Sequence, residues 1–336
     1  MESRRASTEV DPGSLAAEPR RRVTVVICAY SLHRLEILTH AVAAVHDQLR
    51  EGDELLVVID HNQQLLDAAR TALADGSQPL RVIPNENQRG LSGARNAGIA
   101  ASRGELIAFL DDDAVPRAGW LQQLTEPFAD PDVIGTGGVA APAWEAQPPR
   151  WLPEEFLWVV GCSYRGLPET PAQIRNPIGA NMAFRRSTIS RAGGFTDGIG
   201  RVGRTPLGCE ETEFAIRAAR TTGGHIMQEP AATVDHLVTI DRVSPRYFFR
   251  RCWAEGISKA VVSKLAGNGA ATASERGYTT RTLPAGVVAG LRDGLRGDHA
   301  GFMRAGAIVS GLAVTVAGYC RGSVSTLRSH GGQPHA

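Results

Sequence analysis

The stretch "GELIAFLDDDAVP", residues 104–116, runs from a short apolar segment directly into three consecutive carboxylates, Asp111, Asp112 and Asp113. The apolar residues 106–110 predict a buried strand. Adjacent like charges repel one another and resist burial. The sequence therefore predicts a core strand whose carboxyl end carries a negative cluster that a bound cation would offset.

Other apolar runs predict that this strand belongs to an α/β sheet. Buried strands are expected at 23–29, 53–60 and 80–86, with amphipathic helices at 32–49, 64–74 and 91–102. Strands that alternate with helices predict βαβ units and a Rossmann-like, mostly parallel sheet flanked by helices. In open sheets of this kind ligands bind at the carboxyl ends of the strands, where the aspartate cluster and Asp60 both fall.

Composition excludes several classes of protein. The 336 residues are 43% hydrophobic and 21% charged, with a net charge of +1, so no bulk charge indicates a nucleic-acid partner. The five cysteines are scattered and form no C-x-x-C pair, which argues against structural zinc and a disulfide framework. This cysteine usage and the lack of a signal peptide after the first residues predict a cytoplasmic protein.

The aspartate cluster has two interpretations from the residues alone. Asp111 and Asp113 are two apart, so in an extended chain they point to the same side, as ligands of Mg²⁺ or Mn²⁺ would. A solvated acidic turn is the alternative. The strand before the cluster, and Asp60 at the end of a parallel strand, favour a metal–diphosphate site.

Seven segments then follow one another in the order seen in family 2 glycosyltransferases, which this sequence resembles over roughly residues 23–260. They are "VTVVICAYSLHR", "LLVVID", "NQRGLSGARNAGI", "GELIAFLDDDAVPRAGWL", "PIGANMAFRRS", "GGFTDGIG" and "GCEETEF". The resemblance implies the GT-A fold and an inverting transferase that moves a sugar from a nucleotide-diphosphate donor to a hydroxyl acceptor. The acceptor class stays open between a glycan, a lipid-linked glycan and a small molecule.

The resemblance also implies which residues hold the metal. Asp111 and Asp113 match the D-x-D pair that binds Mg²⁺ or Mn²⁺ on the donor diphosphate, and Asp112 would touch the ribose or the sugar. His236 in "TVDHLV" matches a third ligand in several relatives. A hydrogen-bonded structural histidine is the alternative for His236.

Further donor contacts are implied for five residues. Asp60 would read the nucleobase, in a pocket that Ala29 and Tyr30 line. Arg95 would contact the nucleotide, and Asn181 would border the donor sugar and the acceptor. For the glycines around Arg95 the alternatives are a phosphate cradle and tight packing beneath the sheet.

The resemblance places the catalytic base at Glu211 or, second, Glu210. Both begin a predicted helix after Gly208, and because adjacent helix residues face different ways, only one can point into the site. Glu211 occupies the position of the family's aspartate. The alternative is that both carboxylates only stabilise the helix dipole.

Four segments are expected along the chain: a disordered tail (1–22), a nucleotide-sugar-binding half (23–135), an acceptor-binding half (136–240) and a helical region (241–336). The apolar run 305–320 has 16 residues, fewer than the roughly 20 of a spanning helix. We expect a packed or interfacial helix that touches the inner membrane face.

Two other functions fit parts of the pattern. A sugar-1-phosphate nucleotidyltransferase should carry a glycine-rich loop after the first strand, but "CAYSLHRLE" contains no glycine. A non-catalytic nucleotide-sugar-binding protein would not need the acid set Asp60, Asp111, Asp113 and Glu211. The transferase is therefore the favoured interpretation.

Overall fold

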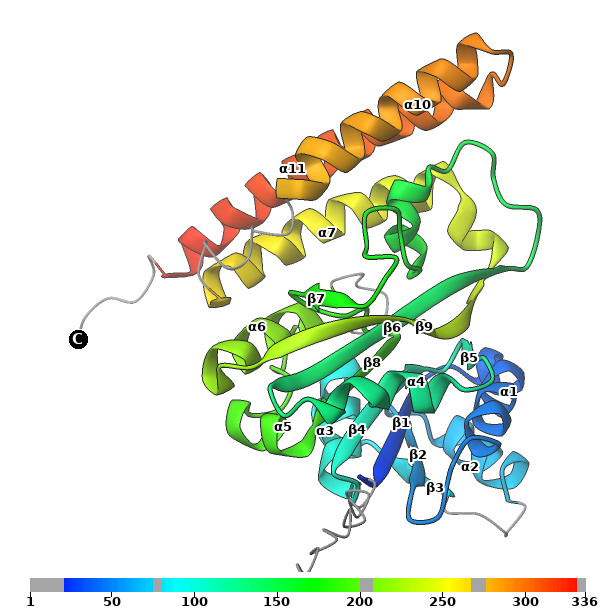
Figure 1. Ribbon diagram of the computed structural model, residues 1–336, viewed down its shortest axis with the longest axis vertical. Coiled ribbons are helices and arrows are strands. Elements are labelled where there is room, and N and C mark those ends of the chain that lie inside the picture. Colours follow the sequence, from blue (N-terminus) through cyan, green and yellow to red (C-terminus); the bar gives the residue numbers. More distant parts are fainter. Residues whose placement is uncertain (1–20, 75–79, 200–207, 267–275, 331–336) are drawn as a thin grey trace, which may run out of the picture.

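A single nine-stranded mixed sheet forms the centre of the computed structural model, which describes residues 21–74, 80–199, 208–266 and 276–330 (Figure 1). The strand order is β3-β2-β1-β4-β8-β6-β9-β5, and β7 pairs with β9. The strands are β1 (Val23–Ala29), β2 (Glu54–Ile59), β3 (Leu80–Pro84), β4 (Leu106–Asp111), β5 (Ala114–Pro116), β6 (Val133–Trp144), β7 (Ala172–Ile174), β8 (Asn181–Arg185) and β9 (His225–Val238).

The expected parallel sheet is confirmed for the first half of the chain. Strands β3, β2, β1 and β4 are all parallel, and Cys28 of β1 pairs in register with Asp111 of β4. The second half is mixed, because β8 lies antiparallel to both β4 and β6, whereas β6 and β9 are parallel. The expected division at residue 136 falls inside β6, so both halves share one sheet.

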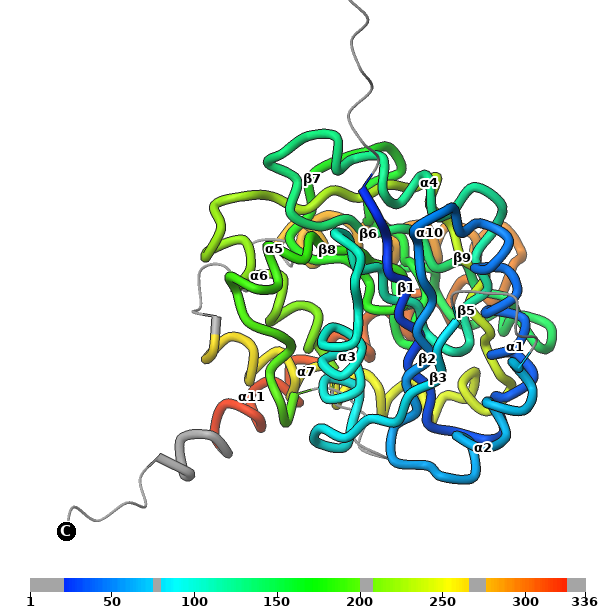
Figure 2. Tube along the Cα trace, turned by 90° about the horizontal axis from the view of Figure 1, so that it is seen from below, coloured from blue at the N-terminus to red at the C-terminus, as the bar shows by residue number. Residues whose placement is uncertain are grey.

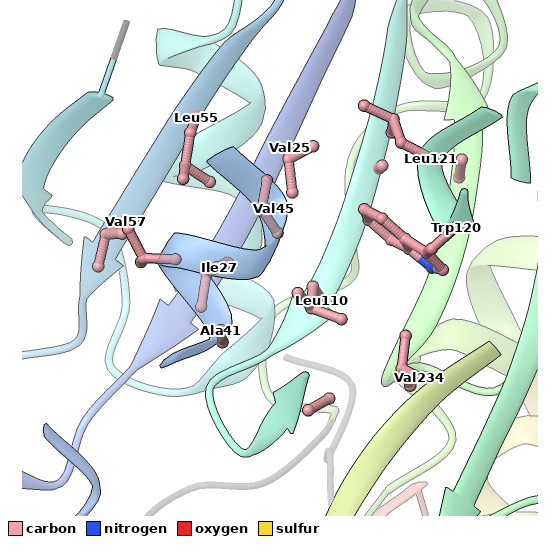
Figure 3. Close-up of a cluster of buried hydrophobic side chains, with 14 of the residues drawn as sticks. Val25, Ile27, Ala41, Val45, Leu55, Val57, Leu110, Trp120, Leu121 and Val234 are labelled. Carbon is pink, nitrogen blue, oxygen red and sulfur yellow. The ribbon is translucent and has the colours of Figure 1, made fainter. Parts of the chain in front are cut away.

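Helices cover both faces of the sheet, as Figure 2 shows for α1 and α2 to one side of β1–β3 and α3 to the other. One face packs α1 (Leu35–His46), α2 (Gln63–Ala72) and α4 (Trp120–Thr125), and the other packs α3 (Leu91–Ala101), α5 (Arg186–Ala192) and α6 (Glu210–Thr222). In Figure 3 the side chains of Val25, Ile27 and Leu110 meet Val45 of α1 and Trp120 of α4. This burial removes apolar surface from water and fixes the carboxyl ends of the strands.

The glycines near Arg95 allow close packing. A Cβ on Gly98 would lie 2.4 Å from Cγ1 of Val26, and one on Gly93 would lie 1.8 Å from the carbonyl oxygen of Gln88. No side chain fits at these distances, so α3 lies directly against β1 at Gly98 and against its own preceding loop at Gly93. Tight packing therefore accounts for Gly93 and Gly98.

The C-terminal region is helical, as expected. It contains α7 (Pro245–Ala266), the π-helical segment η5 (Tyr278–Thr282), α10 (Leu283–Leu295) and α11 (Ala300–His330), and α10 and α11 form a hairpin beside α7 (Figure 1). Small residues let these helices touch, since a Cβ on Gly256 would lie 2.1 Å from the carbonyl oxygen of Thr315.

Helix α11 is longer than the apolar run in the sequence. Its segment Ala300–Val324 has 25 residues and is long and apolar enough to cross a membrane by length and composition, and 22% of an apolar 18-residue stretch within it is buried. The apolar run of 16 residues was bounded by the charged residues Arg304 and Arg321, whereas the helix continues through both of them. The expected disordered tail lies outside the described residues up to residue 20, but Arg21 donates a hydrogen bond to the carbonyl oxygen of Phe128.

The side chain of Asn181 holds three elements of the sheet together. Fully buried, it accepts a hydrogen bond from Nε1 of Trp120 and donates to the carbonyl oxygens of Val139 and Ala232, at 2.8, 3.0 and 2.8 Å. This structural role lies beneath the site, and the expected contact of Asn181 with a sugar stays a prediction.

We expect Asn181→Ala to lower the free energy of unfolding by about 2–4 kcal/mol, because buried partners are left without hydrogen bonds. Urea unfolding followed by circular dichroism measures the change. Gln64→Ala, at an exposed position of α2, is the control and should leave stability close to wild type. A loss below about 0.5 kcal/mol, which is ordinary for a surface position, would contradict this role.

Candidate functional site

The carboxyl end of β4 and the end of β9 bring Asp111, Asp113 and His236 together. Residue 114 of β5 pairs in register with His236 of β9, which carries the imidazole to the aspartate cluster. One ligand atom from each of the three residues lies within 4.8 Å of the others. Two carboxylate oxygens and an imidazole nitrogen are a donor set that Mn²⁺ accepts.

Each carboxylate presents one oxygen to His236. Nε2 of His236 lies 3.3 Å from Oδ1 of Asp113 and 4.0 Å from Oδ2 of Asp111. The other oxygen of Asp113, Oδ2, pairs with Arg34 at 3.0 Å and Arg242 at 3.2 Å. Arg34 and Arg242 thus hold one oxygen of the Asp113 carboxylate, and the other oxygen faces His236.

Cys162 and Gly161 lie beside the imidazole of His236. Its Nδ1 lies 4.0 Å from Sγ of the buried Cys162. Gly161 has a φ of +89°, and a Cβ there would lie 3.1 Å from Cε1 of the ring. A glycine at 161 therefore gives the ring the space that lets Nε2 face the aspartates.

Asp112 points away from this cluster toward Arg34. Its Oδ1 accepts a hydrogen bond of 2.6 Å from Nη1 of Arg34, whereas its buried Oδ2 has no hydrogen-bond partner in the described part of the chain. Burial raises the pKa of Asp112 to about 7, against the attraction of Arg34. A buried oxygen without a partner is uncommon in folded proteins, and it fits the raised pKa, because a neutral carboxyl is easier to bury than a charged one.

Asp60 organises the loop that enters α3. Its two carboxylate oxygens accept hydrogen bonds from Nδ2 of Asn85 at 2.7 Å and from the backbone N–H of Gly90 at 3.0 Å. Nearby, Ala29 is buried in the core and the Tyr30 ring is 52% exposed. Of the pair expected to line a nucleobase pocket, Tyr30 has the accessible side chain.

The two glutamates at the start of α6 face different ways, as expected. Glu210 is buried, and its Oε1 pairs with Nη1 of Arg95 at 2.8 Å, whereas Glu211 is partly exposed and lines a cavity. Nη2 of Arg95 lies 3.8 Å from Oδ1 of Asp111. Arg95 is thus a buried cation between the candidate metal ligands and the glutamates.

The environment of Glu211 suits a proton acceptor. Burial, and next the charge of Glu210, raise its pKa from 4.5 to about 8, although Arg95 acts in the opposite direction. A carboxylate whose pKa lies near the working pH is an efficient general base.

The cavity has a volume of about 770 Å³ and lies between the sheet and the C-terminal helices. Asp111, Arg95, Glu210 and Glu211 line one side of it, and residues of α7, η5 and α11 line the other. Trp158 also lines the cavity, whereas Trp144 and Trp151 pack against a buried apolar cluster.

Sequence reasoning missed the ion pairs around the cluster, made by Arg34 and Arg242, and the packing of Cys162 behind His236. Arg34 stands in a segment that carries the family resemblance, "VTVVICAYSLHR", which was the available signal. Arg242 arrives from η4 (Ile240–Val243), and no local pattern marks it.

Comparison with known proteins agrees with this geometry. The sequence model described as glycosyl transferase family 2 matches residues 24–193. A glucosyl-dolichyl phosphate glucuronosyltransferase of Haloferax volcanii is 32% identical over 245 residues, which cover 73% of this chain and 78% of that protein. A pre-mycofactocin glycosyltransferase of Mycobacterium tuberculosis is 28% identical over 47% of this chain and 32% of its own length.

Two solved structures share the fold. A mannosyltransferase from Pyrobaculum calidifontis, in complex with GDP-Man and Mn²⁺, superposes with a TM-score of 0.59 at 19% identity and covers 89% of this chain and 88% of its own. GalNAc-T7 with UDP, GalNAc and Mn²⁺ has a TM-score of 0.51 at 17% identity, over 72% of this chain and 48% of its own.

We expect His236→Ala to weaken Mn²⁺ binding at least about tenfold, because even disturbance of an outer-shell partner costs this much. Calorimetric titration of the protein with MnCl₂ measures the dissociation constant. His225→Ala, at the other end of β9, is the matched control. If both variants bind Mn²⁺ as the wild type does, His236 is a structural histidine.

Proposed function

Because the chain belongs to glycosyl transferase family 2, we propose that it transfers a sugar from a nucleotide-diphosphate sugar to an acceptor hydroxyl, with inversion at the anomeric carbon. One observation carries the proposal: Asp111 of the metal cluster and Glu211 line the same cavity. A group that binds the leaving diphosphate and a group that takes the acceptor proton are the two parts that single displacement requires.

Asp111, Asp113 and His236 would hold the metal ion, Mn²⁺ or Mg²⁺. When bound, such an ion supplies Lewis-acid stabilisation of the departing diphosphate. The Mn²⁺ in the Pyrobaculum mannosyltransferase and in GalNAc-T7 supports this assignment. Arg34 and Arg242, which pair with Oδ2 of Asp113, would orient its carboxylate toward the ion.

Glu211 would act as the base. As the acceptor oxygen bonds to the anomeric carbon and the bond from that carbon to the diphosphate breaks, Oε1 or Oε2 of Glu211 takes the hydroxyl proton. Glu210 is committed to Arg95 by their ion pair, which makes it the weaker candidate. The pair would instead fix the start of α6 and thus the direction of Glu211.

The remaining donor contacts follow the family resemblance. Asp60 and Tyr30 would bind the nucleobase, with the backbone of Ala29 beside them. Asp112 would contact the ribose or the sugar, as the resemblance implies. Arg95 would act on the diphosphate electrostatically through Asp111, because Nη2 of Arg95 lies 3.8 Å from Oδ1 of Asp111.

We also propose that the protein works in the cytoplasm, on the inner membrane face. The Haloferax relative is named for a dolichyl-phosphate substrate, which a membrane contains. Large apolar side chains of α10 and α11 are exposed, and no charged residue stands between Arg304 and Arg321. The exposed apolar residues are Val288, Leu291, Leu295, Phe302, Met303, Val309, Val316 and Val324.

We expect Glu211→Gln to reduce transfer about 10²–10⁴-fold, the usual contribution of a general base. In the wild type, kcat/KM should rise with pH and level off above about 8, because Glu211 accepts a proton only when ionised and its pKa is about 8. Release of the nucleoside diphosphate, assayed from pH 5 to 9, measures both effects.

Stability provides the control for Glu211. Since its pKa is raised in the folded state, the folded protein favours protonated Glu211, and this contribution is lost as the pH rises through about 8. Glu211→Gln, always neutral, should therefore be more stable than wild type at pH 9. Near-normal transfer by this variant with intact donor binding would exclude Glu211 as the base.

We expect Val309→Glu to release the protein from anionic phospholipid vesicles, because a charge would enter the apolar face of α11. Co-sedimentation with vesicles of phosphatidylglycerol and phosphatidylethanolamine measures the bound fraction. Ile240→Glu changes an aliphatic side chain that is 65% exposed on η4, and it should bind as the wild type does. Wild-type protein that stays in the supernatant would contradict the membrane contact.

A further inference from the structure

The large cavity extends beyond the transfer site to the C-terminal helices. Asp60 and Tyr30, the proposed nucleobase contacts, are not among the described residues that line it, whereas Glu211 is. The cavity therefore lies on the acceptor side of the proposed base. The following inference rests on the proposed function, because it takes Glu211 as the point where the acceptor hydroxyl reacts.

The helix side of the cavity has an apolar wall. Aromatic side chains alone would be compatible with stacking on sugar rings, but aliphatic side chains from three helices share the wall. A fully polar glycan would lose water against them without gaining hydrogen bonds. The apolar lining residues are Phe156, Trp158, Val262, Leu283, Leu312 and Val316.

The same wall carries positive charge. Arg251 and Lys259 lie two turns apart on one face of α7, and Arg281 comes from η5. Arg251 is 7% exposed, so its charge acts in a poorly solvated environment. Glu255, 3.7 Å from Nζ of Lys259, is the carboxylate that α7 adds to the lining. The excess of positive charge is local to this wall, because the other carboxylates of the lining, Asp111, Glu210 and Glu211, belong to the sheet side together with Arg95 and Arg175. Guanidinium groups suit phosphate in particular.

The cavity also reaches the outer surface of α11. Val316 lines the cavity and is 52% exposed. It stands seven residues, or about two helical turns, after the exposed Val309. A hydrocarbon chain that leaves the cavity past Val316 would thus meet the apolar face of α11.

We propose that the acceptor is a lipid-linked sugar phosphate. Its sugar hydroxyl lies at Glu211, and its phosphate lies among Arg251, Lys259 and Arg281. Its hydrocarbon chain follows the apolar lining of the cavity to Val316 of α11. The cavity selects the acceptor by two features together, a negative charge and an apolar chain.

Binding without turnover tests this assignment. The probes are glucose joined to a farnesyl chain through a phosphodiester, farnesyl glucoside without the phosphate, and glucose 1-phosphate without the chain. Quenching of tryptophan fluorescence reports binding, because Trp158 lines the cavity. We expect the phosphodiester lipid to bind at least about tenfold more tightly than either of the others, since each lacks one contribution of about 1.4 kcal/mol or more.

Substitutions locate the phosphate. Arg251→Gln should raise the dissociation constant of the phosphodiester lipid about tenfold or more, as expected for a lost hydrogen bond to a charged group. Arg281→Gln, at an exposed position, should raise it about threefold, within the range of solvated ion pairs, and keeps the test valid if Arg251→Gln does not fold. Arg246→Gln, exposed on the first turn of α7 and outside the cavity lining, is the matched control.

Each other outcome overturns part of the inference. Equal binding of farnesyl glucoside excludes the phosphate site, and equal binding of glucose 1-phosphate identifies a site for soluble sugar phosphates. If both cavity variants bind like Arg246→Gln, the arginines do not hold the phosphate. These results are independent of catalysis. Failure of the wild type to release nucleoside diphosphate from any donor would refute the proposed function alone.

Discussion

The structure depends on the burial of negative charge at the end of β4. Asp112 and Asp113 are each 3% exposed, and an isolated buried carboxylate is costly. The fold offsets this cost with cations from distant parts of the chain. Arg34 follows β1, Arg242 follows β9, and both reach the cluster. The loops after these strands are therefore held in place by the same charges that prepare the site for a cation.

A second buried cation connects the two chemical parts of the site. Arg95 lies in α3 and pairs with Glu210 at the start of α6, and its guanidinium also lies near Asp111 of β4. Breaking a buried ion pair by removing one partner leaves an uncompensated charge. The proposed metal site and the proposed base are thus not independent features, because the helix that carries Glu211 is fixed to the strand that carries Asp111.

The sequence was sufficient for the parts of the fold in which burial is continuous. Strands β1, β2 and β4 are buried on both faces and appear as nearly continuous apolar runs, so their positions along the chain and their polar ends could be predicted. Antiparallel pairing by β8 could not be predicted, because a five-residue strand has no local signal for its partner.

The role of Asn181 also could not be predicted from the sequence. Its side-chain amide forms hydrogen bonds with Trp120 and with two strands, and only the tertiary structure distinguishes this role from a sugar contact. The acids of the site were predicted, whereas Arg242 was not, since long-range charge pairing leaves no pattern in a single segment.

The length of α11 also depends on long-range charge pairing that the sequence does not reveal, and α11 forms part of the cavity wall. In the sequence the apolar run is bounded by Arg304, and a charge usually marks the end of a buried segment. In the fold, Arg304 pairs with Asp293 and Asp298 at the α10–α11 turn, so its charge is neutralised and the helix continues through it. Small residues of α11 pack against α10 at Gly301 and against α7 at Gly318 and Gly322, whereas larger apolar residues stay outside. A helix with this division can form one wall of the cavity and also present an apolar face to a membrane.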